Sequence, residues 1–308
     1  MILTVTLNAA LDLTYRVPRV QPHTTHRVGE IAERPGGKGL NVARVLAALG
    51  HDTVATGLVG GRTGDALRTH LAGTAPGVVD ALVPVCGQTR RTIAVVDASS
   101  GDTTMFNEPG PTVSAQEWAR FQGVYRELLT GARAVALCGS LPPGLSAGSY
   151  AELVHIARSA GVYVLLDTSG EPLRRGTAVH PDVIKPNADE LTQLTGFTEP
   201  LHAAHQARRC GAHAVVASHG PQGLLAVTDE GTWRASPPAR YEGNPTGAGD
   251  AAVAGLLSGL AEGLEWPQRL ARAAALSAAT VLAPAAGDFD TAAYGRLLSR
   301  VKVAKAAE

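Results

Sequence analysis

Short apolar runs that alternate with helix-like segments are the feature that most constrains how this 308-residue chain can fold. Six runs predict buried strands: ILTVTL (2–7), TVATGLV (53–59), RAVALC (133–138), VYVLLD (162–167), DVIK (182–185) and AVVAS (214–218). Segments with helical periodicity lie between several of them: 40–50, 149–161 and 188–196. Strands and helices that alternate at this spacing are typical of a mostly parallel sheet with helices on both faces. The sequence therefore predicts a three-layer α/β/α core.

A small antiparallel β lid is predicted where this alternation breaks. Its candidate strands lie at four places: 11–17, 26–31, 91–97 and 102–108. The first alternates strictly between apolar and polar residues, and the last two flank an Ala-Ser-Ser-Gly turn that is typical of a hairpin. We expect a single domain over 1–308, with the lid inserted at about 11–31 and 89–108. An exposed apolar face on such a lid needs a cover, which the active site or a second subunit would provide.

Composition and charge exclude several classes of function. Apolar residues make up 45% of the chain and charged residues 18%, which is typical of a globular protein. The 27 basic and 27 acidic residues cancel, so no global field recruits nucleic acid or a membrane surface. The aromatic fraction of 4% also argues against stacking platforms for single-stranded nucleic acid. Any anion must therefore be bound by local charges.

The cysteines and the N-terminus predict a soluble cytoplasmic protein. The widely spaced cysteines form no CxxC pair, so buried reduced thiols are expected at all three positions: Cys86, Cys138 and Cys210. The first residues, MILTVTLNAALDLTYRV, lack the basic region and long apolar run of a signal peptide. No apolar stretch is long enough to span a bilayer.

The glycine-rich segment PGGKGLN (35–41) directly precedes a helix-like segment. Glycines let the backbone approach a ligand closely, and Lys38 and Asn41 add donors beside a helix N-terminus. The segment is not a P-loop, because no hydroxyl residue follows Lys38, and it does not fit the dinucleotide fingerprint. By itself it is compatible with a glycine-rich turn or with a ligand-binding loop.

The segment IKPNADE (184–190) offers oxygen ligands at the end of a predicted strand. Asn187 and Glu190 are three residues apart, so on a helix they share a face. Such oxygen ligands suit Mg²⁺, which keeps most of its waters and takes few protein ligands. An N-cap Asn followed by a Glu at the third helical position is the alternative, and it requires no metal.

A tight turn, SHGPQG (218–223), and the segment NPTGAGD (244–250) follow later in the chain. In the second of these, Thr246 is the predicted N-cap of a small-residue helix, and the next three residues present amides that can bind an anion. Asp250 in the first turn has two readings. It is either a solvated acid stabilised by the helix dipole or a base that takes a proton from an attacking hydroxyl.

Taken together, these segments resemble the ribokinase-like (PfkB) carbohydrate kinases. The resemblance extends over essentially the whole chain, in the family's order: GGKGLNVARVLAALG (36–50), GSLPPG (139–144), LLDTSG (165–170), IKPNADEL (184–191) and NPTGAGDA (244–251). The pair GGKGLNVAR and NPTGAGD is most similar to the branch that phosphorylates hexose phosphates. That branch includes 1-phosphofructokinase, tagatose-6-phosphate kinase and the minor 6-phosphofructokinase.

The resemblance implies roles for the residues that match the family's motifs. Asp250 matches the general base, and the amides that bind the transferring phosphate are those of Gly247, Ala248 and Gly249. Positions that bind sugar hydroxyls are Asp12, Gly37 and Asn41. Candidates for the substrate's existing phosphate are Arg27, Lys38, Arg90 and Ser140, with the register at Arg90 or Arg91 open by one. Residues beside the nucleotide phosphates and Mg²⁺ are Lys185, Asn187 and Glu190, and those of the nucleotide loop are Ser218, Gly220 and Gly223.

The resemblance therefore implies ATP- and Mg²⁺-dependent phosphorylation of a hexose phosphate. The candidate substrates are fructose 1-phosphate, tagatose 6-phosphate and fructose 6-phosphate. A lid shared between two subunits is common in this family, so a homodimer is expected by analogy, with neither nucleic acid nor a membrane as a partner. The alternatives are a free-sugar or nucleoside kinase of the same fold and a non-catalytic sensor of sugar phosphate or nucleotide. A dinucleotide-binding oxidoreductase fits less well, because the glycines lie in the wrong places.

Overall fold

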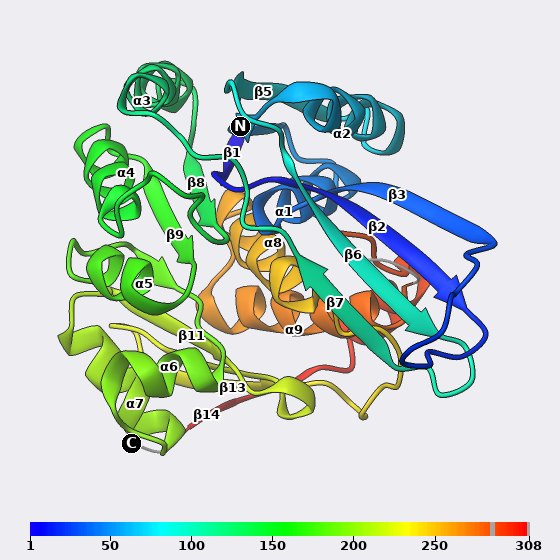
Figure 1. Ribbon diagram of the computed structural model, residues 1–308. Helices are drawn as coiled ribbons and strands as arrows, with labels where there is room; N and C mark the ends of the chain where they lie inside the picture. Colours follow the sequence, from blue (N-terminus) through cyan, green and yellow to red (C-terminus); the bar gives the residue numbers. More distant parts are fainter. Residues whose placement is uncertain (284–286, 307–308) are drawn as a thin grey trace.

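The computed structural model describes residues 1–283 and 287–306, and in these ranges a ten-stranded sheet forms the centre of the molecule (Figure 1). Its strands are, in spatial order, β14 (Lys302–Lys305), β13 (Thr232–Ser236), β12 (Leu224–Val227), β11 (Ala214–Ser218), β10 (Val183–Ile184), β9 (Tyr163–Asp167), β8 (Ala134–Cys138), β1 (Ile2–Thr6), β4 (Thr53–Val59) and β5 (Val78–Pro84). Strands β11 to β5 pair in parallel, and β12, β13 and β14 extend one edge with antiparallel pairing. All six strands predicted from the sequence are present, and the mostly parallel core is confirmed.

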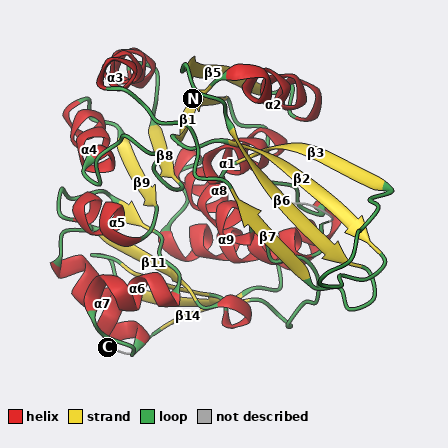
Figure 2. Cartoon of the chain, in the orientation of Figure 1, coloured by secondary structure: helices red, strands yellow, loops and turns green. Residues whose placement is uncertain are grey.

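Helices cover both faces of this sheet and complete the three layers (Figure 2). One face carries α3 (Ala115–Leu129), α4 (Ser149–Ser159), α5 (Gly170–Thr177), α6 (Ala188–Thr195) and α7 (Pro200–Arg209). The other carries α1 (Lys38–Ala48), α2 (Gly61–Thr74), α8 (Ala248–Ala261), α9 (Trp266–Val281) and α10 (Thr291–Leu298). Strand residues alternate between the layers, so Leu137 packs on the first side and Ala136 on the second. Within the described ranges, none of the helices is long and apolar enough to cross a bilayer.

Helix α8 is buried on nearly all sides, which explains its small-residue sequence AAVAGLLSGL. It packs against α1 and lies closely along α9. A Cβ at Gly255 would lie 2.7 Å from the Cα of Ala273, so only glycine permits this approach between the two helices. The packing therefore fixes the position of the first turn of α8 relative to the sheet.

A second sheet of four strands forms the lid, in the order β3 (Glu30–Gly36), β2 (Ala10–Val17), β6 (Arg90–Asp97) and β7 (Thr103–Asn107). It projects to the right of the core in Figure 1. The pairs β2–β3 and β6–β7 are antiparallel, as predicted, whereas the central pair β2–β6 is parallel. Parallel pairing is possible for β2 and β6 because no hairpin joins them: the chain returns to the core between these two strands.

Strand β3 begins later than the sequence predicts. Residues 26–29 lie outside any strand, and β3 continues through Pro35 and Gly36, which resemble a loop in the sequence. The prediction of a strand at 26–31 was therefore wrong for most of its length. Because β3 is an edge strand, the missing amide of Pro35 need not break the ladder.

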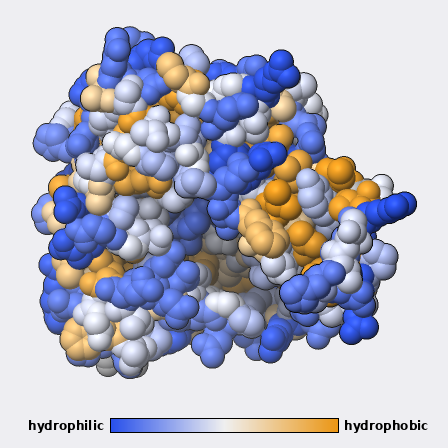
Figure 3. All heavy atoms as spheres, in the orientation of Figure 1, coloured by the Kyte–Doolittle hydropathy of each residue, from blue (hydrophilic) through white to orange (hydrophobic). Residues whose placement is uncertain are grey.

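The lid exposes large apolar side chains on both of its faces. Ile31 and Phe106 are 55% and 58% exposed and share a face with Leu13, whereas Met105 is 44% exposed on the other face. Figure 3 shows apolar residues gathered over this part of the molecule. The expectation that the lid has an apolar surface in need of a cover is thus supported.

The cysteines are free, but they differ in exposure. Cys138 is buried in β8, as predicted, whereas Cys86 and Cys210 are exposed. The prediction of buried thiols was therefore wrong for two of the three positions, because Cys86 lies in a surface loop and Cys210 at the end of α7.

Candidate active site

Two pockets are lined by many of the predicted site residues. The lid-side pocket measures about 500 Å³, and its lining includes Thr6, Asn8, Lys38, Arg90, Ser140 and Glu190. The hairpin-side pocket measures about 620 Å³, and its lining includes Ser218, Gly220, Gly223, Tyr241, Ala248 and Gly249. Both lie beyond the carboxyl ends of parallel strands, where open α/β sheets bind their ligands. Asp250 lines neither pocket, but it directly follows Gly249 of the hairpin-side lining, and the charge of Lys38 from the lid-side lining acts on its carboxyl.

Asp250 is buried, with 6% of its surface exposed, in the first turn of α8. Its Oδ2 accepts a hydrogen bond of 2.8 Å from Asn41 Nδ2 in α1. Burial and the neighbouring Asp167 carboxylate raise the pKa of Asp250 to about 7, against the effects of Asn41, Lys38 and Lys185. A solvated first-turn acid would have neither this burial nor this pKa, so the carboxyl has the properties of a proton acceptor near neutral pH.

The entrance to α8 is built by glycine rather than by a side-chain cap. Gly247 is the N-cap, in the left-handed conformation with φ of 85°, and Thr246 does not cap the helix. The prediction of Thr246 as N-cap was therefore wrong, because a residue with positive φ is required one position later. Ala248 donates its amide to the carbonyl of Pro245, 3.1 Å away. In the described ranges the amides of Gly249 and Asp250 make no backbone hydrogen bond, so they remain available to an anion.

A buried carboxylate links two lysines beside Asp250. Asp167 Oδ1 lies 2.9 Å from Lys38 Nζ, and its Oδ2 lies 3.3 Å from Lys185 Nζ. Burial acts to raise the pKa of Asp167, but the two ammonium groups hold it below its usual value. Burial acts to lower the pKa of Lys38, but Asp167 raises it above its usual value. Lys38 therefore stays charged next to Asp250.

The lid-side pocket has a cationic and hydroxyl wall formed by Arg90 and Ser140. Arg90 donates from Nε to the carbonyl of Asn8 at 3.1 Å, whereas Arg91 is exposed and pairs with Glu108 at 2.6 Å. Alternation along β6 thus sends Arg90 into the pocket and Arg91 outward, so of the two arginines Arg90 is the one that lines the pocket. Ser140 lies in the loop after β8, at the mouth of the same pocket.

Asp12 and Gly37 flank the start of α1, whereas Arg27 lies apart. Burial raises the pKa of Asp12 to about 6. Its carboxylate rests on Gly36, where any side chain would collide with it. Gly37 lines the lid-side pocket and is the N-cap of α1, with φ of 111°. Arg27 is exposed in the loop between β2 and β3 and is not among the residues that line the pocket.

Asn187 and Glu190 form a capping pair, one of the two interpretations that the sequence allowed. Glu190 donates its amide to Asn187 Oδ1, and Asn187 donates its amide to Glu190 Oε2, both at 2.8 Å. The second carboxylate oxygen of Glu190 is not used by this pair, and Glu190 lines the lid-side pocket. Among the described residues, no group of three or more His, Cys, Asp or Glu could hold a metal ion. The unused oxygen of Glu190 is an oxygen ligand of the kind that Mg²⁺ accepts.

The sequence motifs missed two residues that organise the site. Asp167 was visible within LLDTSG, but nothing in one sequence indicates that its carboxylate binds two lysines distant in the chain. Asn8 is buried and contacts Ser140, and its position after a predicted strand was the available signal. Both are joined to their partners by the tertiary fold alone.

The chain is similar to known proteins over nearly its full length. A family model for pfkB family carbohydrate kinases matches residues 5–292. The 1-phosphofructokinase of Rhodobacter capsulatus is 38% identical over 291 residues, which cover 92% of each chain. The tagatose-6-phosphate kinase of Staphylococcus epidermidis is 32% identical over 311 residues, which cover 98% of this chain and 99% of that one.

Solved structures share the fold. The crystal structure of phosphofructokinase-2 from Escherichia coli in complex with fructose-6-phosphate is 30% identical to this chain. It superimposes with a TM-score of 0.89 and covers 97% of this chain and 98% of that one. The two sheets, the motifs at the pockets and the match over residues 5–292 agree. This chain belongs to the pfkB family of carbohydrate kinases.

Proposed function

We propose that this kinase transfers the γ-phosphoryl group of ATP to a hexose phosphate. The candidate substrates are fructose 1-phosphate, tagatose 6-phosphate and fructose 6-phosphate. The observation that carries the proposal is Asp250, a buried carboxyl with a pKa of about 7, which adjoins Gly249 of the hairpin-side pocket and is influenced by the charge of Lys38 in the lid-side pocket. The names of the two curated relatives, both hexose-phosphate kinases, support the same substrate class.

Asp250 acts as the general base. Its ionised carboxylate accepts the proton of the sugar hydroxyl as that oxygen attacks the γ-phosphorus in line. The hydrogen bond from Asn41 leaves Oδ1 of Asp250 for this proton and orients the carboxylate. Asp12, Gly37 and Asn41 lie near the start of α1 and position the other sugar hydroxyls.

The first turn of α8 stabilises the transferred group. The amides of Gly249 and Asp250 and the positive end of the helix dipole face charge that develops on the equatorial oxygens of the phosphoryl group, beside Gly247 and Ala248. Lys185 lies next to this turn, since a Cβ at Gly249 would be 3.4 Å from its ammonium nitrogen. Asp167 pairs with this ammonium and keeps it in place.

The hairpin-side pocket holds the nucleotide. Ser218, Gly220 and Gly223 form its hairpin wall, and Ala248 and Gly249 form the wall beside the phosphates. Mg²⁺, bound by the nucleotide phosphates and through water by Glu190 and Asn187, would offset phosphate charge. The unused Glu190 carboxylate oxygen fits this ion, whereas the capping bonds leave Asn187 little further capacity.

The lid-side pocket binds the phosphate already present on the sugar. Arg90 and Lys38 supply positive charge there, and Ser140 supplies a hydroxyl. The guanidinium of Arg90 can bind two phosphate oxygens at once. Arg27 also remains a candidate contact, from an exposed loop of the lid.

A substrate panel tests the proposal. ADP release is measured with the three hexose phosphates, with free fructose and tagatose, and with adenosine. We expect turnover of at least one hexose phosphate and little turnover of free sugars. Efficient turnover of a free sugar or a nucleoside would favour the alternative kinase. Binding of sugar phosphate without ADP release would favour a sensor.

Arg90→Ala identifies the phosphate contact within the same panel. We expect KM for the hexose phosphate to rise about tenfold or more, because a charge-assisted hydrogen bond is lost. Arg91→Ala is the matched control, because Arg91 is exposed and paired with Glu108, and it should change KM less than twofold. Equal effects of Arg90→Ala on phosphorylated and free sugar would contradict a phosphate contact at this residue.

A homodimer through the lid completes the proposal. Ile31 and Phe106 expose apolar area on one face of a sheet that is open at both edges, and a second copy of the chain would cover it. We expect sedimentation of the wild-type chain as a dimer and of Phe106→Glu as a monomer. A monomeric wild-type chain at micromolar concentration would contradict this assembly.

A further inference from the structure

Asn8 lies in the turn between β1 and β2, and it connects three segments around the lid-side pocket. Its side chain is buried, with 7% of the residue exposed. Nδ2 donates to the carbonyl of Pro109 and to Ser140 Oγ, both at 3.1 Å. The carbonyl of Asn8 accepts from Arg90 Nε, also at 3.1 Å. One residue thus contacts both side chains that form the phosphate-binding wall.

The contact with Pro109 fixes the orientation of the Asn8 amide. A carbonyl oxygen can only accept, so the NH₂ group and not the oxygen of Asn8 must face it. The same NH₂ group then donates to Ser140 Oγ. The alternative orientation would place two acceptors against each other at Pro109.

This donation determines what Ser140 can do. A serine hydroxyl has one hydrogen, and when its oxygen accepts from Asn8 that hydrogen must point elsewhere. Ser140 is exposed at the lid-side pocket, so its hydroxyl is left as a donor toward the cavity. A donor is what a phosphate oxygen requires, because the anion has only acceptors.

Asn8 also constrains Arg90. The Nε of Arg90 is engaged by the Asn8 carbonyl, and Nη1 lies 3.4 Å from both Thr92 Oγ1 and the carbonyl of Glu108. In the part of the chain that the structure describes, Nη2 makes no hydrogen bond. The Nη2 group of Arg90, with its two N–H donors, and the hydroxyl of Ser140 are therefore left available on the same wall.

We propose that Asn8 is a positioning residue that commits the Ser140 hydroxyl to donate to the phosphate on the substrate, and so favours phosphorylated over free hexoses. The proposal rests on the proposed function, because it assumes that this wall binds the substrate phosphate. Asn8 itself acts through Ser140 and touches no reacting atom.

Asn8→Asp reverses the polarity of the contact with little change in shape. The new carboxylate cannot donate, so Ser140 turns its hydrogen toward it and away from the pocket. We expect KM for the hexose phosphate that the panel identifies to rise about tenfold, the loss of one hydrogen bond to a charged group. KM for ATP should change less than twofold, because the hairpin-side pocket is untouched.

Two controls separate this effect from added charge and from the lost contact with Pro109. Asn107→Asp puts a carboxylate on the lining of the same pocket, and no hydrogen bond joins Asn107 to Ser140 in the described structure. In a Ser140→Ala background there is no hydroxyl to orient, whereas the added charge and the loss of the Pro109 contact affect KM in the same way as in the wild-type background. We expect Asn8→Asp to raise KM there only by the small factor seen with Asn107→Asp.

The comparison of Asn8→Asp with and without Ser140→Ala also gives the result that would overturn the proposal. An equal rise in KM with and without the Ser140 hydroxyl would show that Asn8 acts by charge or by packing alone. If Asn8→Asp does not fold, Asn8→Ala gives the same test, because it frees the hydroxyl to rotate and its smaller effect on KM must vanish in the Ser140→Ala background. Failure of the proposed function is distinguishable, since the wild-type chain would then turn over no hexose phosphate.

Discussion

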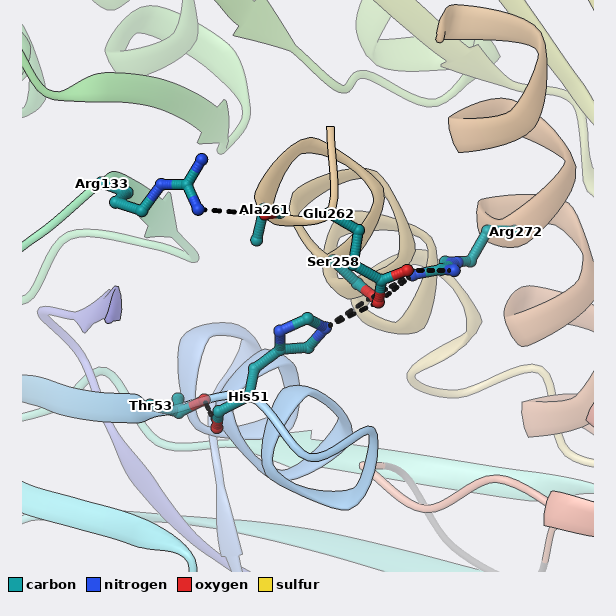
Figure 4. Close-up of polar contacts among 7 residues, drawn as sticks. All are labelled: His51, Thr53, Arg133, Ser258, Ala261, Glu262 and Arg272. Atoms are coloured by element: carbon teal, nitrogen blue, oxygen red, sulfur yellow. Dashed lines mark hydrogen bonds and ion pairs between the residues drawn. The ribbon is translucent and has the colours of Figure 1, made fainter. Parts of the chain in front are cut away.

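The two ends of helix α8 place polar groups inside the protein in opposite ways. At the N-terminal end, Asp250 is buried with a hydrogen bond from Asn41, and burial helps to raise its pKa to about 7. At the other end, Ser258 is fully buried, yet His51 and Arg272 both contact its hydroxyl, as Figure 4 shows. The neighbours of Asp250 thus compensate its charge only in part, whereas the hydroxyl of Ser258 has two polar partners.

At the far end, a network of polar contacts joins α8 to α9 and to the loops before β4 and β8. His51 Nε2 lies 2.8 Å from Ser258 Oγ, and Arg272 of α9 donates to the same oxygen at 2.6 Å. Arg272 also binds both carboxylate oxygens of Glu262 at 2.6 Å and keeps the pKa of that carboxyl below its usual value. Arg133 donates to the carbonyl of Ala261 at the helix C-terminus, 3.0 Å away. This end therefore ties α8 to its neighbours.

One end of the helix thus contributes to stability, and the other has the properties of a reactive group. A buried carboxyl with a raised pKa makes the folded state less stable at neutral pH, because its charged form is poorly solvated. A buried carboxyl of this kind is typical of functional sites, whereas the hydrogen bonds and ion pairs of Arg272 with Ser258 and Glu262 are explained by stability alone. Substitutions at the two ends should therefore act on different observables.

Asp250→Asn should have the largest effect on activity. An amide cannot accept the sugar proton, so we expect kcat to fall about 10³-fold, within the range of general-base contributions. Binding of ATP and of the sugar phosphate should stay near normal, as measured by calorimetry, because the new side chain has nearly the same shape. Near-normal kcat would contradict the assignment of the base.

The same substitution should make the protein more stable. The folded-state pKa of Asp250 is raised from 3.8 to about 7, so its ionisation penalises the folded state above about pH 4, and the penalty is complete above about pH 7. Asparagine removes that penalty and can still accept the bond from Asn41. We expect a higher melting temperature for Asp250→Asn, with a larger gain at pH 8 than at pH 5. A lower melting temperature at pH 8 would show that the ionised carboxylate does not destabilise the folded protein.

A pH profile sharpens the comparison with a smaller effect. Because Asp250 must be ionised to accept a proton, kcat/KM should fall about tenfold per pH unit below pH 7 and level off above about pH 8. The hydrogen bond from Asn41 lowers the pKa of Asp250, so Asn41→Ala should move this limb to higher pH, whatever it does to KM. If the acidic limb of the kcat/KM profile lies at the same pH in Asn41→Ala, the titrating group is not Asp250.

The sequence was sufficient for the elements and for the motifs at their ends. Apolar runs and helical periodicity placed the strands of the parallel core, and GGKGLN, KPNADE and PTGAGD all come to the pockets. Parallel strands bring the loops after them to one edge of the sheet, so motifs far apart in the chain must converge there. The order of elements alone therefore located the candidate site.

What the sequence could not provide depends on three-dimensional contacts. Pro35 suggested a loop, but the edge position of β3 accommodates it. Thr246 suggested a cap, but the turn requires the positive φ of Gly247. Asp167 contacts Lys38, and Asn8 contacts Arg90 and Ser140, all more than 80 residues away, and no spacing rule in one chain reveals such pairs.

Arg272→Ala should have the smallest effect on kcat and a clear effect on stability. It removes the donor that Ser258 and Glu262 share, so we expect the free energy of unfolding in urea to fall by about 2 kcal/mol. Arg174→Ala is a matched control, because Arg174 pairs with Glu171 on the exposed surface and its loss should hardly change stability. With kcat unchanged in Arg272→Ala, the two ends of α8 are energetically separate. A matching fall in kcat would mean that the far end of the helix helps to position Asp250, because the first turn is held by the packing of α8 against α9.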